Sequence, residues 1–377
     1  MSDIEQQSAN FNRSPRVLTQ EFTGGDLSIP APPDNPAFTG QNPLLTILPM
    51  FGLLAFAGIS IFTGLTTGAA ISILFGIAML FGAGVSGVLG YQTQRQRRRE
   101  HEHSRIKNEF DYLRSLEQRR IRLQAAHHAQ KGALLRNFPE PAQWLNIAIN
   151  RNTVLWERRP ENNDFMHYRM GIGLLPSLVD VKVPQSDRFG DMLDEAIDLV
   201  EEYRYLDNTP ITASLRDDVA VGIAGKRNTL LRSVRAIISG LAVTHAPTDL
   251  QIYVVAPRAR YEDWRWMTWL PHASSQRQGD NADLVAFDET SIRNLMGNLG
   301  QLIDQRQEEK DASRVPHLLL IVDEPQLVEN EAVFSSILRQ GDAIGASAIC
   351  LVTNPEDIPS DCGAIIELED DNSFKYA

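Results

Sequence analysis

Residues 44–62, LLTILPMFGLLAFAGISIF, and residues 69–91, AAISILFGIAMLFGAGVSGVLGY, decide how this chain is organised. They lie in a run of sixty residues between Asp34 and Arg95 that contains no Asp, Glu, Lys or Arg. No soluble fold needs so long an uncharged run, whereas a transmembrane helix needs ~20 predominantly apolar residues. The run therefore predicts a hairpin of two membrane-spanning helices over residues 43–92, with a turn at residues 63–68 (TGLTTG).

Charge is distributed unevenly along the chain. Of its 377 residues, 1–94 carry a net charge of −3, 95–136 carry +7, and the remainder carries −16, which together give −12. The second apolar stretch is followed directly by Arg95, Arg97, Arg98 and Arg99, and basic residues near the ends of spans lie on the cytoplasmic side. We therefore expect a cell-membrane protein with both termini in the cytoplasm, and the acidic body argues against bulk nucleic-acid binding.

The second apolar stretch carries a stripe of small residues. Gly82, Ser86 and Gly90 recur every four residues, a spacing that lets another helix approach closely in a membrane. Two interpretations stay open, since the stripe could pack within the hairpin or against a partner subunit. Glycine is also simply common in membrane helices.

Residues 93–136 are predicted to form a helical stalk that continues the second span. Apolar residues spaced by three, four and seven predict a narrow seam on this helix: Ile106, Phe110, Leu113, Leu116 and Leu123. We expect the seam, with Leu113 and Leu116, to bind a partner. His127 and His128 are expected at a solvated helix end and not at a metal site, because adjacent residues point to different sides of a helix.

Residues 137–377 are predicted to form an α/β domain. Strand-like runs cover 171–183, 219–224, 250–256, 318–322, 346–353 and 364–368, and helical periodicity fits 189–202, 228–244, 290–307 and 329–340. Alternation of this kind predicts a mostly parallel sheet covered by helices on both faces, as in P-loop NTPases.

The turn after residues 219–224 resembles part of a phosphate-binding loop, G-x-x-x-x-G-K-[ST]. In that loop, backbone amides cradle phosphates, the lysine neutralises charge and the hydroxyl binds Mg²⁺. Here Ala220 stands in place of the first glycine and Arg227 in place of the hydroxyl. The candidate cofactor-binding residues are Gly222, Gly225, Lys226 and Thr229, the last two positions late. The loop is degenerate, and it predicts at most weak binding of ATP and Mg²⁺.

The run LLLIVDE at 318–324 predicts a buried strand that ends in Asp323 and Glu324. In an active ATPase the first carboxylate would coordinate Mg²⁺ through water and the second would polarise the attacking water. The alternative is that the pair caps a following helix. The sequence favours the inherited ATPase geometry without implying activity. Cys350 and Cys362 predict neither a structural disulfide nor a metal site, and a reducing compartment is expected.

Other residues are weaker candidates. Asn354 follows the next strand, where such folds often place a polar sensor, although a plain turn is equally consistent. Arg306 and Arg339 could reach a neighbouring subunit in a ring, but we expect them on solvated helix faces. Three of the five tryptophans could form a partner-binding patch or pack beneath a loop: Trp264, Trp266 and Trp269.

Several segments resemble one family. LWERRP at 155–160 and NDFMHYRMGIG at 163–173 resemble the "LWERRP…DPDFLxLRxGxG" signature of EccC, the membrane ATPase of type VII secretion systems and a relative of the FtsK/SpoIIIE translocases. Asn163 and the MHY run at 166–168 depart from the usual proline and aliphatic residues. WRWMTWLPH at 264–272 resembles the family's "W…WLPH" segment, and RSPR at 13–16 and IPAPP at 29–33 resemble its N-terminal arm.

The resemblance implies an arm (1–42), the hairpin (43–92), the stalk (93–136) and a membrane-proximal ATPase-like domain (137–377). It also implies three further ATPase modules in full-length relatives, hexameric self-association, other secretion-system membrane subunits as partners, secreted proteins as substrates, and no DNA. Whether the chain is truncated or naturally short stays open. The expected role is to couple the motor to the membrane pore, and hydrolysis would fall mainly to the other modules. Two alternatives remain: an active ATPase that uses Lys226, Asp323 and Glu324, and an FtsK-like DNA translocase.

Overall fold

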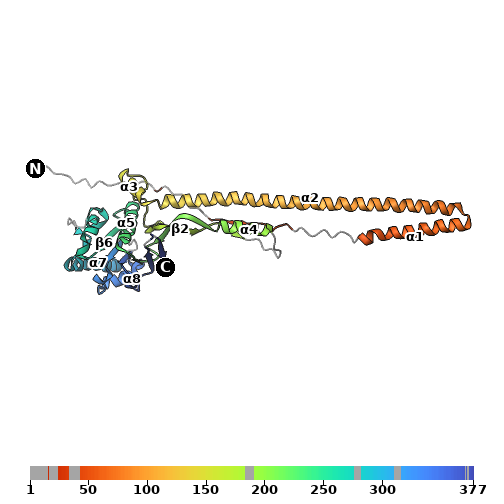
Figure 1. Ribbon diagram of the computed structural model, residues 1–377. Helices are drawn as coiled ribbons and strands as arrows, with labels where there is room; N and C mark the ends of the chain where they lie inside the picture. Colours follow the sequence, from red (N-terminus) through yellow and green to blue (C-terminus); the bar gives the residue numbers. More distant parts are fainter. Residues whose placement is uncertain are drawn as a thin grey trace. The chain divides into compact units, whose positions relative to one another are not determined.

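The computed structural model describes residues 16, 24–33, 43–182, 191–275, 282–309, 316–369, 371 and 373–377. The chain divides into two compact units (Figure 1). The helical unit comprises Gly24–His127 and Ser177–Arg204, and the α/β unit comprises Met1–Thr23, His128–Pro176 and Tyr205–Ala377. The expected arm falls mostly outside the described residues.

Two long helices dominate the helical unit, α1 (Pro43–Thr67) and α2 (Ala70–Asn137). Each contains a stretch long and apolar enough to cross a membrane. The turn is shorter than the expected 63–68, because α1 continues to Thr67. Within this last part of α1, the hydroxyls of Thr63, Thr66 and Thr67 donate to carbonyls four residues back. The chain reverses at Gly68, whose φ of 72° favours glycine.

The two apolar helices pack through small residues, but on another face than the one predicted. Gly76 of α2 lies against Ile61, and Gly87 lies against Met50. Among the described residues, Gly82 has no neighbour within 4 Å of where its Cβ would be, and Ser86 is exposed. Packing within the hairpin through Gly82 and Ser86 is therefore wrong. The reason is geometric, since each residue turns the helix by about 100° and the contacting glycines fall on a different side.

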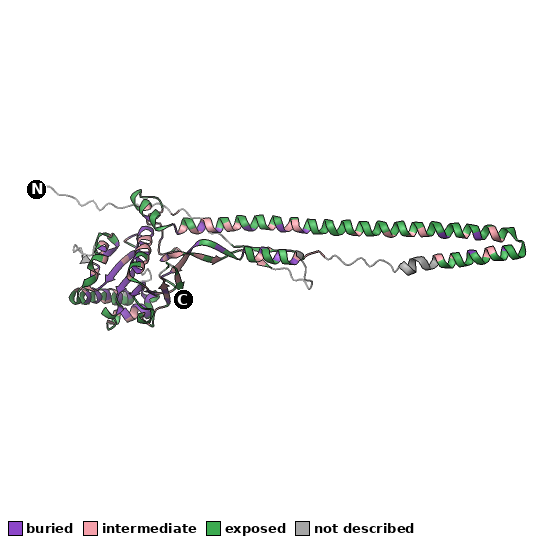
Figure 2. Cartoon of the chain, in the orientation of Figure 1, coloured by how far each residue is buried: buried purple, intermediate pink, exposed green. Residues whose placement is uncertain are grey.

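α2 runs for 68 residues as one helix, so the second apolar stretch continues directly into the residues that were predicted to form a stalk. Figure 2 shows that most of its surface is exposed. Three shorter elements of the same unit are α4 (Asp191–Glu202), β1 (Asp26–Ser28) and β3 (Asp180–Lys182), of which β1 and β3 pair in parallel.

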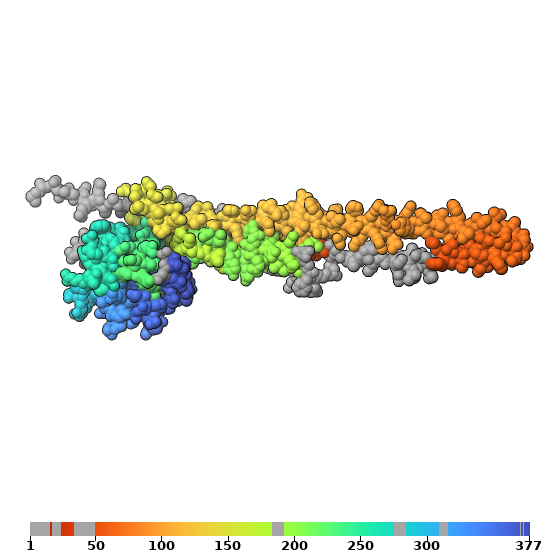
Figure 3. Space-filling model, in the orientation of Figure 1, coloured from red at the N-terminus to blue at the C-terminus, as the bar shows by residue number. Residues whose placement is uncertain are grey.

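The seam of the stalk is partly covered by the chain itself. Leu116 and Leu123 are 6% and 1% exposed and pack with Leu199 of α4 and with Ile29. Figure 3 shows α4 lying along this part of α2. The expectation that Leu116 binds another protein is therefore wrong, because the chain itself covers this residue. Leu113 is half-buried against the same cluster.

His127 also differs from the expectation of a solvated helix end. Its Nε2 lies 3.0 Å from the carbonyl oxygen of Tyr203 and 3.2 Å from Oγ of Ser177. The sequence could not show this, because both partners lie far along the chain.

The core of the α/β unit is a seven-stranded sheet in the order β13-β12-β5-β11-β10-β6-β9. All neighbours are parallel except β12 and β13, which confirms the mostly parallel sheet. The strands are β5 (Ala220–Ala224), β6 (Leu250–Val255), β9 (Val285–Ala286), β10 (His317–Asp323), β11 (Ala346–Val352), β12 (Ala364–Leu368) and β13 (Phe374–Tyr376).

Helices cover both faces of this sheet (Figure 1), so every residue of β5, β10 and β11 is buried. One face packs with α5 (Arg227–Thr244), the other with α7 (Glu289–Glu309) and α8 (Ala332–Ile344). The short elements α6 (Tyr261–Trp264), β7 (Ser274–Ser275) and β8 (Ala282–Asp283) lie between β6 and β9 in sequence.

Three elements differ from the sequence-based prediction, one in its bounds and two because they were not predicted at all. The strand expected over 171–183 is β2 (His167–Pro176), which pairs antiparallel with the unpredicted β4 (Tyr205–Ser214) outside the main sheet. Register shifts on either side of Gly171–Gly173 interrupt this pair. The short helix α3 (Pro141–Ile149) packs on α5 and was also unpredicted.

Candidate functional site

The two halves of the predicted nucleotide pocket meet at the carboxyl edge of the sheet. β5 leads through Gly225 and Lys226 into α5, and β10 ends at Asp323, followed by Glu324. β11 lies between these two strands. Since the carboxyl ends of parallel strands share one edge, the loop and the carboxylates are brought together at the place where open α/β sheets bind ligands.

A guanidinium takes the place of the missing hydroxyl. Arg227, the first residue of α5, donates from Nη1 and Nη2 to the two oxygens of Asp323 at 2.8 and 2.7 Å. It also donates from Nη2 and Nε to Oδ2 of Asp263 at 2.6 and 3.1 Å. Burial acts to lower the pKa of Arg227, but the bonds to Asp323 and Asp263 outweigh it and raise the pKa above its ordinary value.

Asp323 is fully engaged by protein groups. Its side chain is 3% exposed, and Nε1 of Trp264 donates to Oδ2 at 2.7 Å, in addition to the two bonds from Arg227. A buried carboxylate needs such partners, because an unpaired charge in the interior costs several kcal/mol. The guanidinium thus supplies the positive charge that a metal ion would supply at this carboxylate.

These residues do not fit a bound Mg²⁺. The ion requires near-ideal octahedral coordination by oxygen ligands. Here Arg227, a cation, stands in place of the expected hydroxyl ligand. Asp323 is bonded to Arg227 in a bidentate arrangement, the strongest kind of arginine–carboxylate pair.

The glycines of the loop have structural reasons to be glycine. A Cβ at Gly225 would lie 2.9 Å from Cβ of Leu368 in β12, and a Cβ at Gly222 would collide with the side chain of Ile358. Thr229 lines a separate open groove of about 710 Å³ together with Arg232. Of the four predicted cofactor-binding residues, Thr229 is the one that lines this groove.

Glu324 has an unusual backbone. Its φ of 78° places it in the left-handed region, which non-glycine residues seldom occupy. Its Oε1 lies 3.8 Å from Nη2 of Arg260, and its side chain is half exposed. The following Pro325–Leu327 is a 3₁₀ turn to which, in the described part of the chain, Glu324 gives no side-chain cap. The alternative that Asp323 and Glu324 cap a helix is therefore wrong.

The three tryptophans do not form one patch. Trp264 is fully buried and bonded to Asp323, and Trp266 donates from Nε1 to the carbonyl of Asp263 at 2.9 Å. Trp269 is 81% exposed. The expected partner surface is wrong for Trp264, and packing beneath the loop is the correct interpretation there.

The weaker candidates are also placed. The amide of Asn354 donates to Asp357 at 3.2 Å within its own turn. Arg306 is buried and donates to the carbonyls of Ile344 and Pro316, so a solvated helix face is wrong for it. Arg339 is exposed and pairs with Asp361 at 2.9 Å.

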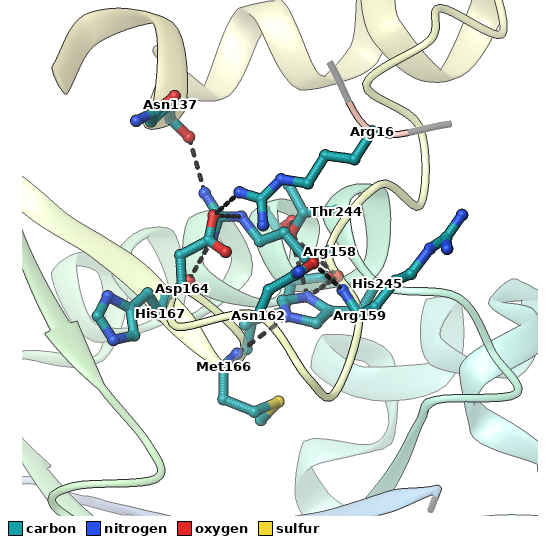
Figure 4. Close-up of polar contacts among 12 residues, drawn as sticks. Arg16, Asn137, Arg158, Arg159, Asn162, Asp164, Met166, His167, Thr244 and His245 are labelled. Carbon is teal, nitrogen blue, oxygen red and sulfur yellow. Dashed lines mark hydrogen bonds and ion pairs between the residues drawn. The ribbon is translucent and has the colours of Figure 1, made fainter. Parts of the chain in front are cut away.

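A second polar centre lies where α2 ends (Figure 4). Arg158 of the LWERRP segment is 2% exposed and donates to the carbonyls of Asn137 and His167, both at 2.7 Å. Its Nε lies 3.2 Å from Asp164, which also accepts a bond from Arg16. One buried arginine thus joins the last residue of α2, the first residue of β2 and, through Asp164, Arg16. Burial lowers the pKa of Arg158 to about 10, with Asp164 opposing that shift.

A neutral histidine lies beside this centre. His245 is fully buried, accepts the backbone N–H of Met166 on Nε2 at 3.0 Å, and has Nδ1 2.9 Å from the carbonyl of Leu241. Only the neutral ring can accept on one nitrogen and donate from the other, and burial holds the pKa of His245 well below its ordinary value. The LWERRP segment could have pointed to Arg158, whereas no sequence signal marks His245.

Comparison with known proteins finds relatives that are all named as ESX or type VII secretion system proteins. No family model matches the chain. It is 26% identical over 263 residues to the ESX secretion system protein EccC of Geobacillus thermodenitrificans, covering 68% of this chain and 18% of the relative. It is 32% identical over 219 residues to EccC of Thermomonospora curvata, covering 56% and 16%. It is 21% identical over 370 residues to the type VII secretion system protein EssC of Staphylococcus aureus, covering 95% and 24%.

The chain therefore spans between 16% and 24% of the length of these relatives. Among solved structures, ATPases 2 and 3 of Thermomonospora curvata EccC, in complex with a signal sequence peptide, align with 56% of this chain and 37% of that one, at 20% identity and a TM-score of 0.38.

Proposed function

We propose that this chain, a homologue of the EccC, EssC and YukB proteins of ESX (type VII) secretion systems, is the membrane-anchored part of a secretion motor. In this proposal the α/β unit does not hydrolyse ATP. It couples the membrane pore to hydrolysing modules of the same motor, and secreted proteins reach the machine through those modules.

One observation carries the non-hydrolytic assignment, the bidentate bond between Arg227 and Asp323. Phosphoryl transfer in P-loop enzymes depends on a metal ion that bridges the β- and γ-phosphates and is held by the loop hydroxyl and this carboxylate. In this chain Arg227 stands in place of the hydroxyl, and the carboxylate, Asp323, is bonded to that arginine. Lys226 remains exposed at the start of α5, so weak nucleotide binding without turnover is compatible with the proposal.

The membrane assignment rests on α1 and α2, whose apolar stretches satisfy the length and composition of spans. The arginines that follow the second stretch favour a multi-pass protein of the cell membrane with both termini in the cytoplasm. We propose other type VII membrane subunits and further copies of the chain, in a hexamer, as partners. The exposed Gly82, Ser86 and Trp269 are candidate contacts.

The hydrolysis assignment is tested on the whole chain in lipid nanodiscs. The unaltered protein should release phosphate at background rate, its melting temperature should not respond to MgATP, and Glu324→Gln should change nothing. The matched variant carries Ala220→Gly and Arg227→Thr, which completes the G-x-x-x-x-G-K-T loop. This variant should gain thermal stabilisation by ATP that depends on Mg²⁺.

Two results would overturn this assignment in favour of an active ATPase. They are turnover by the unaltered chain at ~1 s⁻¹ or faster, and loss of that turnover in Glu324→Gln. Purification from native membranes tests the secretion role separately. Copurifying secretion-pore subunits support it, whereas copurifying DNA supports the FtsK-like translocase.

A further inference from the structure

Two arginines meet at one carboxylate oxygen in the α/β unit (Figure 4). Nη2 of Arg16, a residue that precedes α1, donates to Oδ2 of Asp164 at 2.5 Å, and Nε of Arg158 lies 3.2 Å from the same oxygen. The side chains of Arg16 and Asp164 are 19% and 21% exposed. This ion pair is therefore better shielded from water than an exposed surface pair such as Lys182 with Asp26, whose side chains are 60% and 71% exposed.

Among the described residues, the charges around Asp164 are balanced by Arg16. Glu157 is half-buried beside the same group, and burial raises its pKa, while Arg16 is the first of the charges that oppose this shift. Burial lowers the pKa of Arg158, Asp164 and Glu157 oppose that lowering, and Arg16 adds to it. Two carboxylates, which we call the acidic pair (Glu157 and Asp164), thus face one buried arginine. Charge complementarity favours a second arginine at the acidic pair, and the N-terminal arm supplies it.

Arg158 connects the acidic pair to the end of α2. It donates to the carbonyl of Asn137, the last residue of α2, and to that of His167, the first residue of β2. A carbonyl at the C-terminal end of a helix has no partner within the helix, so Arg158 satisfies a group that α2 leaves free. Because a guanidinium is a rigid plane, the approach of its Nε to Asp164 also fixes the directions in which its two Nη groups donate.

We propose that Arg16 is a strap residue, which binds the acidic pair, holds Asp164 against Arg158 and so secures the end of α2 to the α/β unit. Arg16 precedes α1 and Asn137 ends α2, so one polar centre holds the chain on both sides of the two apolar helices. When Arg16 leaves, the acidic pair carries one negative charge in excess over Arg158, and Asp164 loses a bond that fixes its position. The end of α2 then opens more often.

Hydrogen exchange of the whole chain in lipid nanodiscs tests the strap. The readout is taken from the stalk-end peptide, residues 128–140, and from the exchange of β10 as an internal reference. Arg16→Ala should accelerate exchange of the stalk-end peptide several-fold and leave β10 unchanged. Asp164→Asn should also accelerate it. Adding Arg16→Ala to Asp164→Asn should bring no further acceleration, because both changes remove the same bond.

Two variants serve as matched controls. Arg13→Ala removes the other arginine of the RSPR run, and Lys182→Ala removes the exposed pair with Asp26, so neither should change exchange of the stalk-end peptide. Arg16→Lys should keep most of the protection, because an ammonium can still donate one bond to a carboxylate. A peptide of residues 10–22, added to the Arg16→Ala chain, should restore protection, and the same peptide with Arg16→Ala should not.

Two results would overturn the proposal. If Asp164→Asn accelerates exchange of the stalk-end peptide and Arg16→Ala does not, Arg158 and Asp164 hold α2 without the arm. If Arg13→Ala and Arg16→Ala accelerate it equally, the net charge of the arm is the cause, and the bond to Asp164 is not. Neither outcome depends on ATP turnover or on secretion, so the strap can fail while the proposed function stands.

Discussion

Where a P-loop ATPase carries a hydroxyl that binds Mg²⁺, this chain carries Arg227, whose side chain reaches Asp323 at the end of β10. The guanidinium also holds Asp263, next to the buried Trp264. The loop that contains both residues is thus fastened to the edge of the sheet. Arg227 thus forms a structural joint between α5, the loop that carries Asp263 and the end of β10.

This joint predicts strong coupling between two substitutions. Arg227→Ala leaves Asp323 buried with one partner fewer, and we expect the α/β unit to lose about 3 kcal/mol of unfolding free energy. Because Arg227→Ala and Asp323→Asn remove the same pair, the double variant should lose at least about 1 kcal/mol less than the sum of the two single losses. Denaturant unfolding of the three variants measures these values.

Arg293→Ala is the matched control for this cycle. Arg293 pairs with Glu289 on the surface of α7, with both side chains mostly exposed, so its loss should cost less than about 0.5 kcal/mol. Equal losses in Arg227→Ala and Arg293→Ala would show that the Arg227 bonds contribute no more than a surface pair.

The sequence located the candidate pocket only in part, for a physical reason. Asp323 and the loop could be found because they follow apolar runs at a fixed spacing. Asp263 and Trp264 bond to Arg227 and Asp323 across 36 and 59 residues of chain. Such partners are chosen by the tertiary fold, and residues in a charged, aromatic loop give no local pattern that identifies them.

At the scale of elements, the local sequence pattern predicted helix and strand bounds well where the residues of an element are uniformly buried. β5, β10 and α5 lie within about a residue of their expected bounds, because fully buried strands and an amphipathic helix impose continuous or periodic apolar sequence. β4 was missed because it contains polar residues and Pro210, which argue against a strand. It tolerates them because β2 is its only strand partner in the described part of the chain.

The contact between α4 and the stalk gives a prediction at this scale. Leu116→Asp should release α4, because a charged side chain cannot stay in the cluster with Leu199 and Ile29. Hydrogen exchange of Asp191–Glu202 should then rise by an order of magnitude or more, as expected for a loss of ~2 kcal/mol or more. The melting of the α/β unit should stay nearly unchanged.

Ile106→Asp provides the control on the same helix, since Ile106 is 58% exposed. Hydrogen exchange of α4 should not change in this variant. If both substitutions accelerate exchange equally, general weakening of α2 is the cause, and loss of the contact with α4 is not.

At the scale of the whole molecule, three buried histidines predict acid sensitivity. Burial lowers the pKa of His272 to about 4 and of His317 to about 3, and holds that of His245 well below its usual value. In the unfolded chain these rings take up a proton near pH 6.5, whereas the folded protein keeps them neutral. The stability of the α/β unit is therefore complete above about pH 6.5 and falls as the pH drops towards 4.

Thermal melting between pH 7.5 and 4.5 measures this loss, which should approach roughly 1.4 kcal/mol per pH unit for each histidine. His317→Gln should reduce the slope, and His103→Gln, at an exposed position, should not. A melting temperature that is flat down to pH 4.5 would contradict the neutral, buried assignment of the three rings.

Membrane topology gives a further prediction. Single cysteines at Ser8 and Ser104, in a background with Cys350→Ser and Cys362→Ser, should both resist a membrane-impermeant thiol reagent in intact cells. Both should react after the cells are opened, which serves as the control. Labelling of either position from outside would contradict a hairpin with both ends in the cytoplasm.

The unbroken helix α2 has one more consequence. Over its 68 residues it is about 100 Å long, and each residue adds about 1.5 Å and 100° of rotation. One inserted residue would therefore change the angular phase between its apolar start and the end that Arg158 holds, while an insertion of seven residues would nearly restore it. Insertions or deletions of about seven residues are therefore the changes in stalk length that leave the faces of α2 itself nearly in phase along the helix.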